Sequence, residues 1–263
     1  YGDKIRSLFL PEEGRQWGSF DYSQQEPRLV AHYAASVNAN FTGADDFIKS
    51  YQNEEADFHQ LVADMAGISR TQAKTINLGL FYGMGKAKLS KELGIDKDNA
   101  ERLLIKYNDR VPFVKKLANE VTNSASKYGF IRTIRGRKCR FDMWEPATFG
   151  MNKAMQYEEA KAIYGNNIRR AFTYKALNRL IQGSAADQTK QAMIDCYKAG
   201  YKPMLQIHDE LCFSVNSEED IKPIKQKMET AGHFVYQGGM FSADKDFLAY
   251  VNALDDKSCV QDL

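Results

Sequence analysis

Two aspartates that lie far apart in the sequence are the first candidates for chemistry. Asp21 ends a short segment that starts at Gln16, and Asp209 lies in a His-Asp-Glu turn between two apolar segments. Two unpaired carboxylates about 4 Å apart would repel by roughly 4 kcal/mol at an effective dielectric constant of about 20, and a divalent cation between them reverses that sign. Such oxygens suit Mg²⁺, and two ions can hold the attacking and leaving oxygens of a phosphoryl transfer. A turn or helix-capping role is the simpler alternative for each acid taken alone.

A regular repeat predicts a helix with a chemically distinct face. Arg70, Lys74, Leu78 and Tyr82 follow one another at intervals of four residues, which places them within an arc of about 120° on a helix. An arginine and a lysine one turn apart match the oxygens of a triphosphate. The leucine and the tyrosine beyond them would then cover a base and its pairing partner. A solvated basic edge on a buried helix is the alternative.

Basic residues gather in two later segments, which are candidates for contacting a polyanion. Residues 131–140 contain five lysines and arginines. The next cluster consists of Arg169, Arg170, Lys175 and Arg179. Such clusters neutralise phosphates without reading a base sequence. Asn178 and Gln182 lie one helical turn apart, so both amides can face the same groove of a duplex. A charge-rich solvated hairpin is the alternative for the first cluster.

The composition limits the class of protein. The chain has 263 residues, of which 43% are apolar and 27% charged, as in ordinary globular proteins. The 36 lysines and arginines nearly balance the 34 aspartates and glutamates, so a polyanion site requires local clustering. The four cysteines have no metal-binding spacing, which is typical of reduced thiols in a cytosolic protein. There is no apolar run of membrane-spanning length and no signal peptide. The chain has no starting Met, so we expect a fragment of a longer protein.

The pattern of apolar residues predicts the elements that must position these groups. Strands are expected at 16–21, 204–207 and 211–215, and the last two form a hairpin with acids at its tip. A strand-turn-strand is expected at 129–141. Helices are expected at 27–35, 57–66, 69–82, 96–107, 111–128, 158–164 and 171–199. The fold class that follows is α+β, in which a small antiparallel sheet carries the acids and a large helical insertion accompanies it.

Four segments resemble motifs of the family A DNA polymerases, the DNA polymerase I family. Asp21 to Arg28 resembles the first palm motif, and Arg70 to Gly83 resembles the nucleotide-binding helix of the fingers. Asn178 to Asp187 resembles the primer–template helix, and His208 to Glu210 resembles the final palm motif. The motifs follow the order of that family, and the resemblance covers about residues 5–215.

The resemblance implies a polymerase palm, built from a small antiparallel sheet with helices, and a helical fingers subdomain. The palm would comprise residues 1–45 and 129–263, and the fingers residues 46–128. An insertion is expected at about 142–168, and the chain as a whole resembles a virus or phage polymerase more than a bacterial repair enzyme. Residues 234–263 lack the usual closing strand pattern. The thumb and the exonuclease domain are expected to be absent from this chain.

The resemblance also implies roles for single residues. Asp21 and Asp209 would hold two Mg²⁺ ions, for which Mn²⁺ can substitute, and Glu210 would be an adjacent acid with a less direct role. The implied catalytic residues are Asp21, Asp209, Glu210 and Lys74. The implied nucleotide-binding residues are Gln24, Glu26, His59, Arg70, Lys74, Leu78 and Tyr82. The implied DNA-binding residues are Arg28, Arg137, Asn178, Gln182 and His208.

Two of the nucleotide-binding positions concern selectivity. Glu26 resembles a steric gate that fills the space of a ribose 2′-hydroxyl, and Tyr82 would support it. Leu78 stands where well-known members of the family have an aromatic residue, which bears on base stacking and on discrimination between sugars.

The implied function is template-directed synthesis of DNA from deoxynucleoside triphosphates on a primer–template, in the cytoplasm of a cell or of a viral host. Further expected partners are the thumb and exonuclease portions or a processivity factor. A single-subunit RNA polymerase is one alternative, which Glu26 argues against because a ribonucleotide enzyme needs a small residue at the gate. A non-catalytic nucleic-acid-binding fragment is the other alternative.

Overall fold

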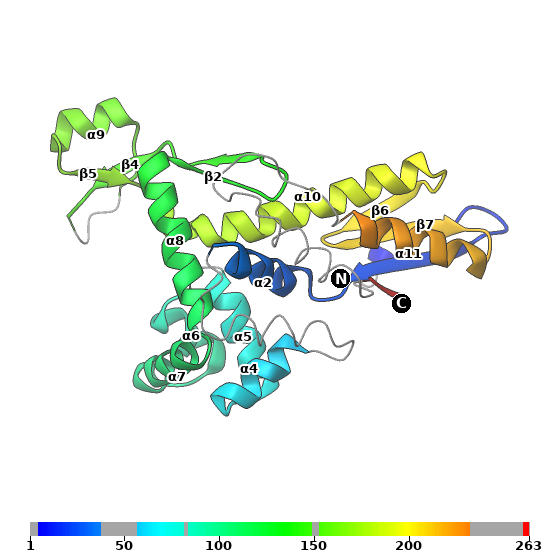
Figure 1. The fold of residues 1–263 in the computed structure, drawn as a ribbon, viewed down its shortest axis with the longest axis horizontal. Helices are drawn as coiled ribbons and strands as arrows, with labels where there is room; N and C mark the ends of the chain where they lie inside the picture. Colours follow the sequence, from blue (N-terminus) through cyan, green and yellow to red (C-terminus); the bar gives the residue numbers. More distant parts are fainter. Residues whose placement is uncertain (1–4, 38–56, 82–83, 149–152, 232–259, 263) are drawn as a thin grey trace.

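A computed structural model describes residues 5–37, 57–81, 84–148, 153–231 and 260–262 (Figure 1). The fold class is α+β, as the sequence predicts. A four-stranded antiparallel sheet and two small hairpins combine with a lobe of helices. Helix α2 (Gln25–Val37) lies between the sheet and that lobe (Figure 1). Within these ranges, no helix has both the length and the apolar character needed to cross a membrane.

The four-stranded sheet brings the two predicted acidic segments together. Its strand order is β6 (Pro203–Ile207), β7 (Glu210–Val215), β1 (Gln16–Tyr22) and β8 (Val260–Asp262). In the antiparallel register of β1 and β7, Asp21 lies opposite Glu210. Asp209 directly precedes β7, so it comes next to Asp21 although 209 − 21 = 188 positions separate them. The predicted strands at 16–21, 204–207 and 211–215 are confirmed.

Strand β8 is an element that the sequence did not predict. Residues 234–263 show no closing strand pattern in the sequence, yet β8 pairs with β1 and places Asp262 opposite Phe20. A strand of three residues is too short to show an alternation of apolar and polar side chains, which is why the sequence does not indicate it.

One side of the sheet is covered by helices α10 (Ala176–Lys198) and α11 (Ile221–Thr230). Phe20 and Phe213 meet edge to face, with 5.6 Å between their ring centroids. The Tyr22 hydroxyl donates to the carbonyl oxygen of Met228 at 2.6 Å. Helix α11 was not predicted. Its packing holds the ends of β1 and β7, and therefore the two aspartates, in fixed positions.

The helical lobe follows the predicted helices closely. It contains α4 (Phe58–Ala66), α5 (Arg70–Phe81), α6 (Lys86–Leu93), α7 (Lys97–Arg110) and α8 (Pro112–Tyr128). The Asp57 carboxylate caps α4 by accepting from the backbone of His59 at 2.9 Å. Ser69 caps α5, because its hydroxyl accepts from the backbone of Gln72 while the Gln72 side chain accepts from the backbone of Ser69. Only α6 was not predicted in this lobe.

A buried hydrogen-bond junction fixes α10 against α2. The Tyr33 and Ser184 hydroxyls are 2.7 Å apart, and Ser184 also accepts from the backbone of Ile134 at 3.1 Å. Ile134 lies in the turn between β2 (Phe130–Arg132) and β3 (Lys138–Arg140), the predicted hairpin. Three segments of the larger core are thereby held together beside the pocket described below.

Two segments differ from the predicted elements. The helix expected at 171–199 is interrupted, because Phe172 has a φ of 61° and a short 3-10 turn precedes α10. The expected insertion forms a hairpin of β4 (Trp144–Pro146) and β5 (Ile168–Arg170), and between these strands lies α9 (Tyr157–Tyr164). This module lies near the C-terminal end of α8 (Figure 1). The proposed boundaries of palm, fingers and insertion stay predictions.

Candidate active site

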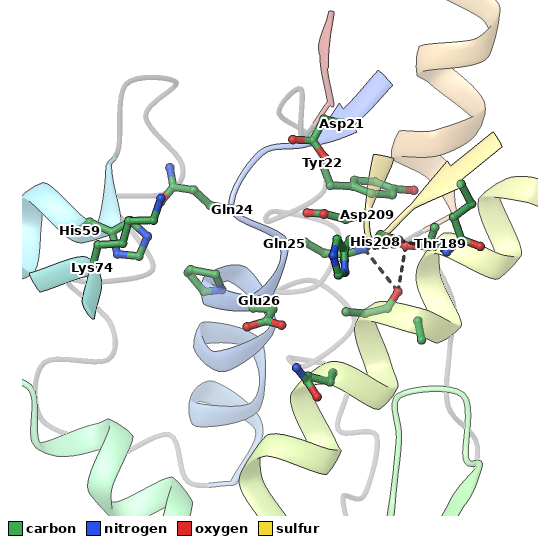
Figure 2. Close-up of a pocket in the computed structure, with 15 residues that line it drawn as sticks. Asp21, Tyr22, Gln24, Gln25, Glu26, His59, Lys74, Thr189, His208 and Asp209 are labelled. Atoms are coloured by element: carbon green, nitrogen blue, oxygen red, sulfur yellow. Dashed lines mark hydrogen bonds between the residues drawn. The ribbon is translucent and has the colours of Figure 1, made fainter. Parts of the chain in front are cut away.

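A pocket of about 770 Å³ lies where the sheet, α2, α10 and the helical lobe meet. Figure 2 shows Asp21 and Asp209 on the sheet side and Lys74 and His59 on the side of the helical lobe. The lining residues are Asp21, Tyr22, Gln24, Gln25, Glu26, Pro27, His59, Lys74, Gln182, Ala185, Ala186, Thr189, Gln206, His208 and Asp209.

The sheet side of the pocket is an acidic edge formed by Asp21 and Asp209. Burial raises the pKa of Asp21 to about 6, and the charges of Asp209 and Glu210 add to the effect. Burial likewise raises the pKa of Asp209. Two carboxylates that oppose each other's ionisation fit a divalent cation, which would relieve the repulsion. No group of three or more His, Cys, Asp or Glu residues that could hold a metal occurs in the described part of the chain.

The neighbouring acid, Glu210, belongs to a different environment. Its carboxylate accepts from Arg6, with Nη2 and Oε2 2.8 Å apart, and from the Ser19 hydroxyl. Glu210 is buried and does not line the pocket. Asp209 lies in the turn before β7, whereas Glu210 is the first residue of that strand and pairs with Asp21 in the ladder, so the two adjacent acids have different neighbours.

The opposite side of the pocket is a basic edge formed by Lys74 and His59. Both side chains line the pocket, Lys74 from α5 and His59 from α4. Arg70, one turn before Lys74, does not line it. Its Nε donates to Asp57 Oδ2 at 2.6 Å, which ties the start of α5 to the start of α4.

The far end of the predicted helix face is only partly described. The backbone of Leu78 belongs to α5, but its side chain and the whole of Tyr82 lie outside the described residues. The expected contact between Tyr82 and Glu26 therefore also lies outside them.

The first turn of α2 connects the two edges. Glu26 and Gln24 both line the pocket, and Gln24 has a positive φ of 54°. Gln25 is buried, and its amide nitrogen donates to the side chains of Gln188 at 3.2 Å and Thr189 at 3.3 Å on α10. These bonds anchor α2 to α10 where Glu26 faces the cavity (Figure 2).

The predicted DNA-binding residues fall into two groups. Gln182 and His208 line the pocket, whereas Asn178, Arg28 and Arg137 do not. The buried amide nitrogen of Asn178 has no hydrogen-bond partner among the described residues. Arg28 Nε donates to the carbonyl oxygen of Ser23 at 2.9 Å.

Arg137 is held against α10 instead of facing the pocket. Its Nε lies 2.9 Å from Asp187 Oδ1, and its Nη2 donates to the carbonyl oxygen of Gly183 at 2.8 Å. The side chain of Arg137 is about half exposed and that of Asp187 is buried, so the pair fixes the β2–β3 hairpin on the helix.

The structure adds lining residues that the sequence did not single out, among them Gln25, Ala186 and Thr189. Ala186 lies four residues after Gln182, and Thr189 lies three residues after Ala186, which is the spacing of one helix face. That spacing on one face of a long helix is the signal that could have identified them. Gln25 had no such signal, because its role depends on partners more than 160 positions away.

The fold and the pocket define a class. A small antiparallel sheet that carries two aspartates, facing a helix that carries Lys74, is the architecture of a polymerase palm with helical fingers. The family model described as DNA polymerase family A matches residues 1–235. The chain belongs to DNA polymerase family A, and the similarity extends beyond residue 215, where the motif resemblance ends.

Several proteins similar to this chain are DNA polymerases. A DNA-directed DNA polymerase of Pseudomonas phage M6 is 37% identical over 86% of this chain. The thermostable DNA polymerase I of Thermus filiformis is 31% identical over 88% of it. This chain spans 37% of the length of the first relative and 26% of the second.

A solved structure has a similar fold. It is the POL domain of Pol1 from M. smegmatis in complex with DNA primer-template and dNTP. The two chains superpose with a TM-score of 0.66 and 29% sequence identity, and the match covers 88% of this chain and 39% of that one.

Proposed function

We propose that this chain carries the polymerising centre of a DNA-directed DNA polymerase. It would transfer deoxynucleotides from their triphosphates to the 3′ end of a primer paired with a template. The observation that carries the proposal is the single pocket that joins Asp21 and Asp209 to Lys74 and His59. The relatives named DNA polymerase and the similar domain in complex with primer-template and dNTP support the same function.

The acidic edge would hold two Mg²⁺ ions. Bound there, the ions would supply the positive charge that offsets the charge developing on the reacting phosphate. Asp21 and Asp209 orient their oxygens from two adjacent strand ends, so the sheet sets the separation of the ligands. The raised pKa values of both acids support this role, because a group that opposes ionisation gains most from a positive neighbour.

The basic edge would receive the triphosphate. Lys74 contributes a mobile positive charge and His59 a ring nitrogen, and both reach the pocket from adjacent helices. Arg70 would act at a greater distance, since it is engaged with Asp57. A triphosphate placed between the two edges has its reacting phosphorus near the acids and its outer phosphates near Lys74.

The pocket residues between the two edges would contact the sugar of the nucleotide and the 3′ end of the primer. Glu26 lines the pocket at the first turn of α2, and a side chain of that length can occupy the space of a 2′-hydroxyl. This position favours deoxynucleotides over ribonucleotides and supports DNA over RNA synthesis. Gln182 and His208 line the side formed by α10 and the β6–β7 turn, where the terminal base pair would lie.

Primer extension by the full-length protein tests the function. Asp21→Asn should reduce the extension rate by a factor on the order of 10²–10³ or more, because an amide cannot hold the cations. DNA affinity should change little. Asp142→Asn is the matched control, since Asp142 is exposed and does not line the pocket. Extension by Asp21→Asn at more than a few per cent of the normal rate would refute the proposal.

A further inference from the structure

Two buried polar side chains behind the basic edge form a line of hydrogen bonds that ends at the pocket. Asn77 on α5 and Tyr107 on α7 are both 0% exposed. The Tyr107 hydroxyl donates to Asn77 Oδ1 at 2.8 Å. Asn77 Nδ2 lies 3.0 Å from Nδ1 of His59. The line therefore runs from α7 through α5 to a ring on α4 that lines the pocket.

The phenol sets the direction of this line. Burial raises the pKa of Tyr107, so the hydroxyl keeps its proton and needs an acceptor. Asn77 Oδ1 is that acceptor. Turning the amide of Asn77 around would direct its NH₂ group at the phenol oxygen and leave the phenol proton with no acceptor among the described residues. Buried donors without an acceptor are rare and destabilising, so the amide orientation is fixed.

The fixed amide in turn fixes the histidine. The NH₂ group of Asn77 can only donate, so His59 Nδ1 must accept and carries no proton. Burial is the largest influence on the pKa of His59 and lowers it. The Asp57 charge opposes this shift, and the charges of Arg70 and Lys74 add to it. An uncharged ring with a bare Nδ1 carries its proton on Nε2, the nitrogen on the other side of the ring from Asn77.

We propose that Asn77 and Tyr107 are positioning residues that hold His59 as the uncharged Nε2–H tautomer, so that Nε2 donates a hydrogen bond to a phosphate oxygen of the incoming nucleotide. The identity of this ligand rests on the proposed function. Lys74 and His59 then divide the work at the basic edge. The Lys74 ammonium provides a positive charge, whereas the uncharged His59 ring provides one directed hydrogen bond. The phosphates are thereby oriented without a second positively charged side chain at the basic edge.

Two substitutions alter the line in different ways. Tyr107→Phe removes the donor that fixes the amide, so Asn77 can turn and His59 should populate both tautomers. Asn77→Asp replaces the donor by a carboxylate, which can only accept from Nδ1 and should move the ring to the Nδ1–H or the doubly protonated form. Tyr33→Phe is the matched control, because it also removes a buried phenol hydroxyl, one that pairs with Ser184 on α10.

Nitrogen NMR of the His59 ring in the full-length protein, near neutral pH, tests this line of hydrogen bonds without an activity measurement. The unsubstituted protein and Tyr33→Phe should show Nε2–H. Tyr107→Phe should show mixed tautomers, and Asn77→Asp should lose the Nε2–H signature. An Nδ1–H or doubly protonated ring in the unsubstituted protein would overturn the proposal, as would an unaltered ring in both Tyr107→Phe and Asn77→Asp.

Titration of a deoxynucleoside triphosphate into the protein bound to a dideoxy-terminated primer–template tests the link to phosphate. Tyr107→Phe should weaken apparent affinity about three- to tenfold, in line with the loss of one oriented hydrogen bond, and Tyr33→Phe should not. Unchanged affinity in both line variants would refute the phosphate contact. If the NMR results hold but the unsubstituted protein fails to extend a primer, the failure counts against the proposed function alone and the positioning of His59 stands.

Discussion

The two edges of the pocket are assembled in opposite ways. The acidic edge joins Asp21 and Asp209 from strands that meet only in the folded chain, 188 positions apart. The basic edge joins His59 and Lys74, which are 74 − 59 = 15 positions apart, on two consecutive helices. The acidic edge therefore depends on long-range strand register, and the basic edge depends mainly on local caps and helix spacing.

This difference predicts where substitutions are tolerated. Where a turn meets a strand, adjacent residues have different neighbours, so the acid next to Asp209 can have an unrelated role. On a helix, positions one turn apart share a face, so two such side chains can serve the same contact and differ only in how much each contributes. The predictions below test each half of the comparison, from the largest expected effect to the smallest.

The adjacent acids Asp209 and Glu210 should behave as unlike residues. Asp209→Asn should lower the primer-extension rate by a factor on the order of 10²–10³ or more, with little change in thermal stability. Glu210→Gln weakens a partly buried pair with Arg6, in which only Glu210 is buried, so it should mainly lower the free energy of unfolding, by about 1–3 kcal/mol. Extension rates and denaturant unfolding of both variants check this. Equal losses of activity would show that the different neighbours of the two acids do not separate their roles.

Lys74 and Arg70, one turn apart on α5, should differ only by degree. Lys74→Ala should reduce kcat/KM for the nucleotide by roughly ten- to a hundredfold, since a charge-assisted contact contributes about 1.5–3 kcal/mol. Arg70→Ala should have a smaller effect, because Arg70 is engaged with Asp57. Steady-state kinetics with varied nucleotide concentration measure both. A larger loss in Arg70→Ala would mean that Arg70 leaves Asp57 and reaches the triphosphate itself.

Glu26 lies between the edges and should affect selectivity more than rate. Glu26→Ala opens room for a 2′-hydroxyl, so ribonucleotide insertion relative to deoxynucleotide should rise by roughly tenfold or more. Single-nucleotide insertion of matched ribo- and deoxynucleotides measures the ratio. A role limited to the helix dipole predicts instead a stability loss of only about 0.3–1 kcal/mol with unchanged selectivity.

His32 on α2, the helix that joins the two edges, should make the free energy of unfolding depend on pH without affecting catalysis directly. Burial lowers the pKa of His32 on α2 from 6.5 to about 4. Between these values the unfolded chain binds a proton that the folded chain does not. The stability is therefore intact above about pH 6.5 and falls as the pH drops toward 4. The full loss is at most about 3 kcal/mol.

His32→Leu isolates this contribution, because leucine does not titrate. Unfolding free energies of the two proteins, measured from neutral pH to about pH 4.5, should fall more steeply for the unsubstituted protein. Parallel curves would mean that His32 is not the group that takes up the proton.

Much of the basic edge was contained in the sequence. The caps Asp57 and Ser69 mark where α4 and α5 begin, and the interval between Arg70 and Lys74 places them on one face. These features depend on hydrogen bonds and spacings within a few residues, which a sequence displays directly. The motifs around Asp21 and Asp209 also indicate a nucleotide-transferring family from the sequence alone.

Only the tertiary structure decided which of these residues share the pocket. It turned Glu210 toward Arg6, engaged Arg70 with Asp57 and held Arg137 against Asp187. It also aligned Tyr107 and Asn77 behind His59. Each outcome depends on how distant segments pack, and packing is set by the shape of the whole core, whereas spacing along the chain determines only the face of its own helix or strand.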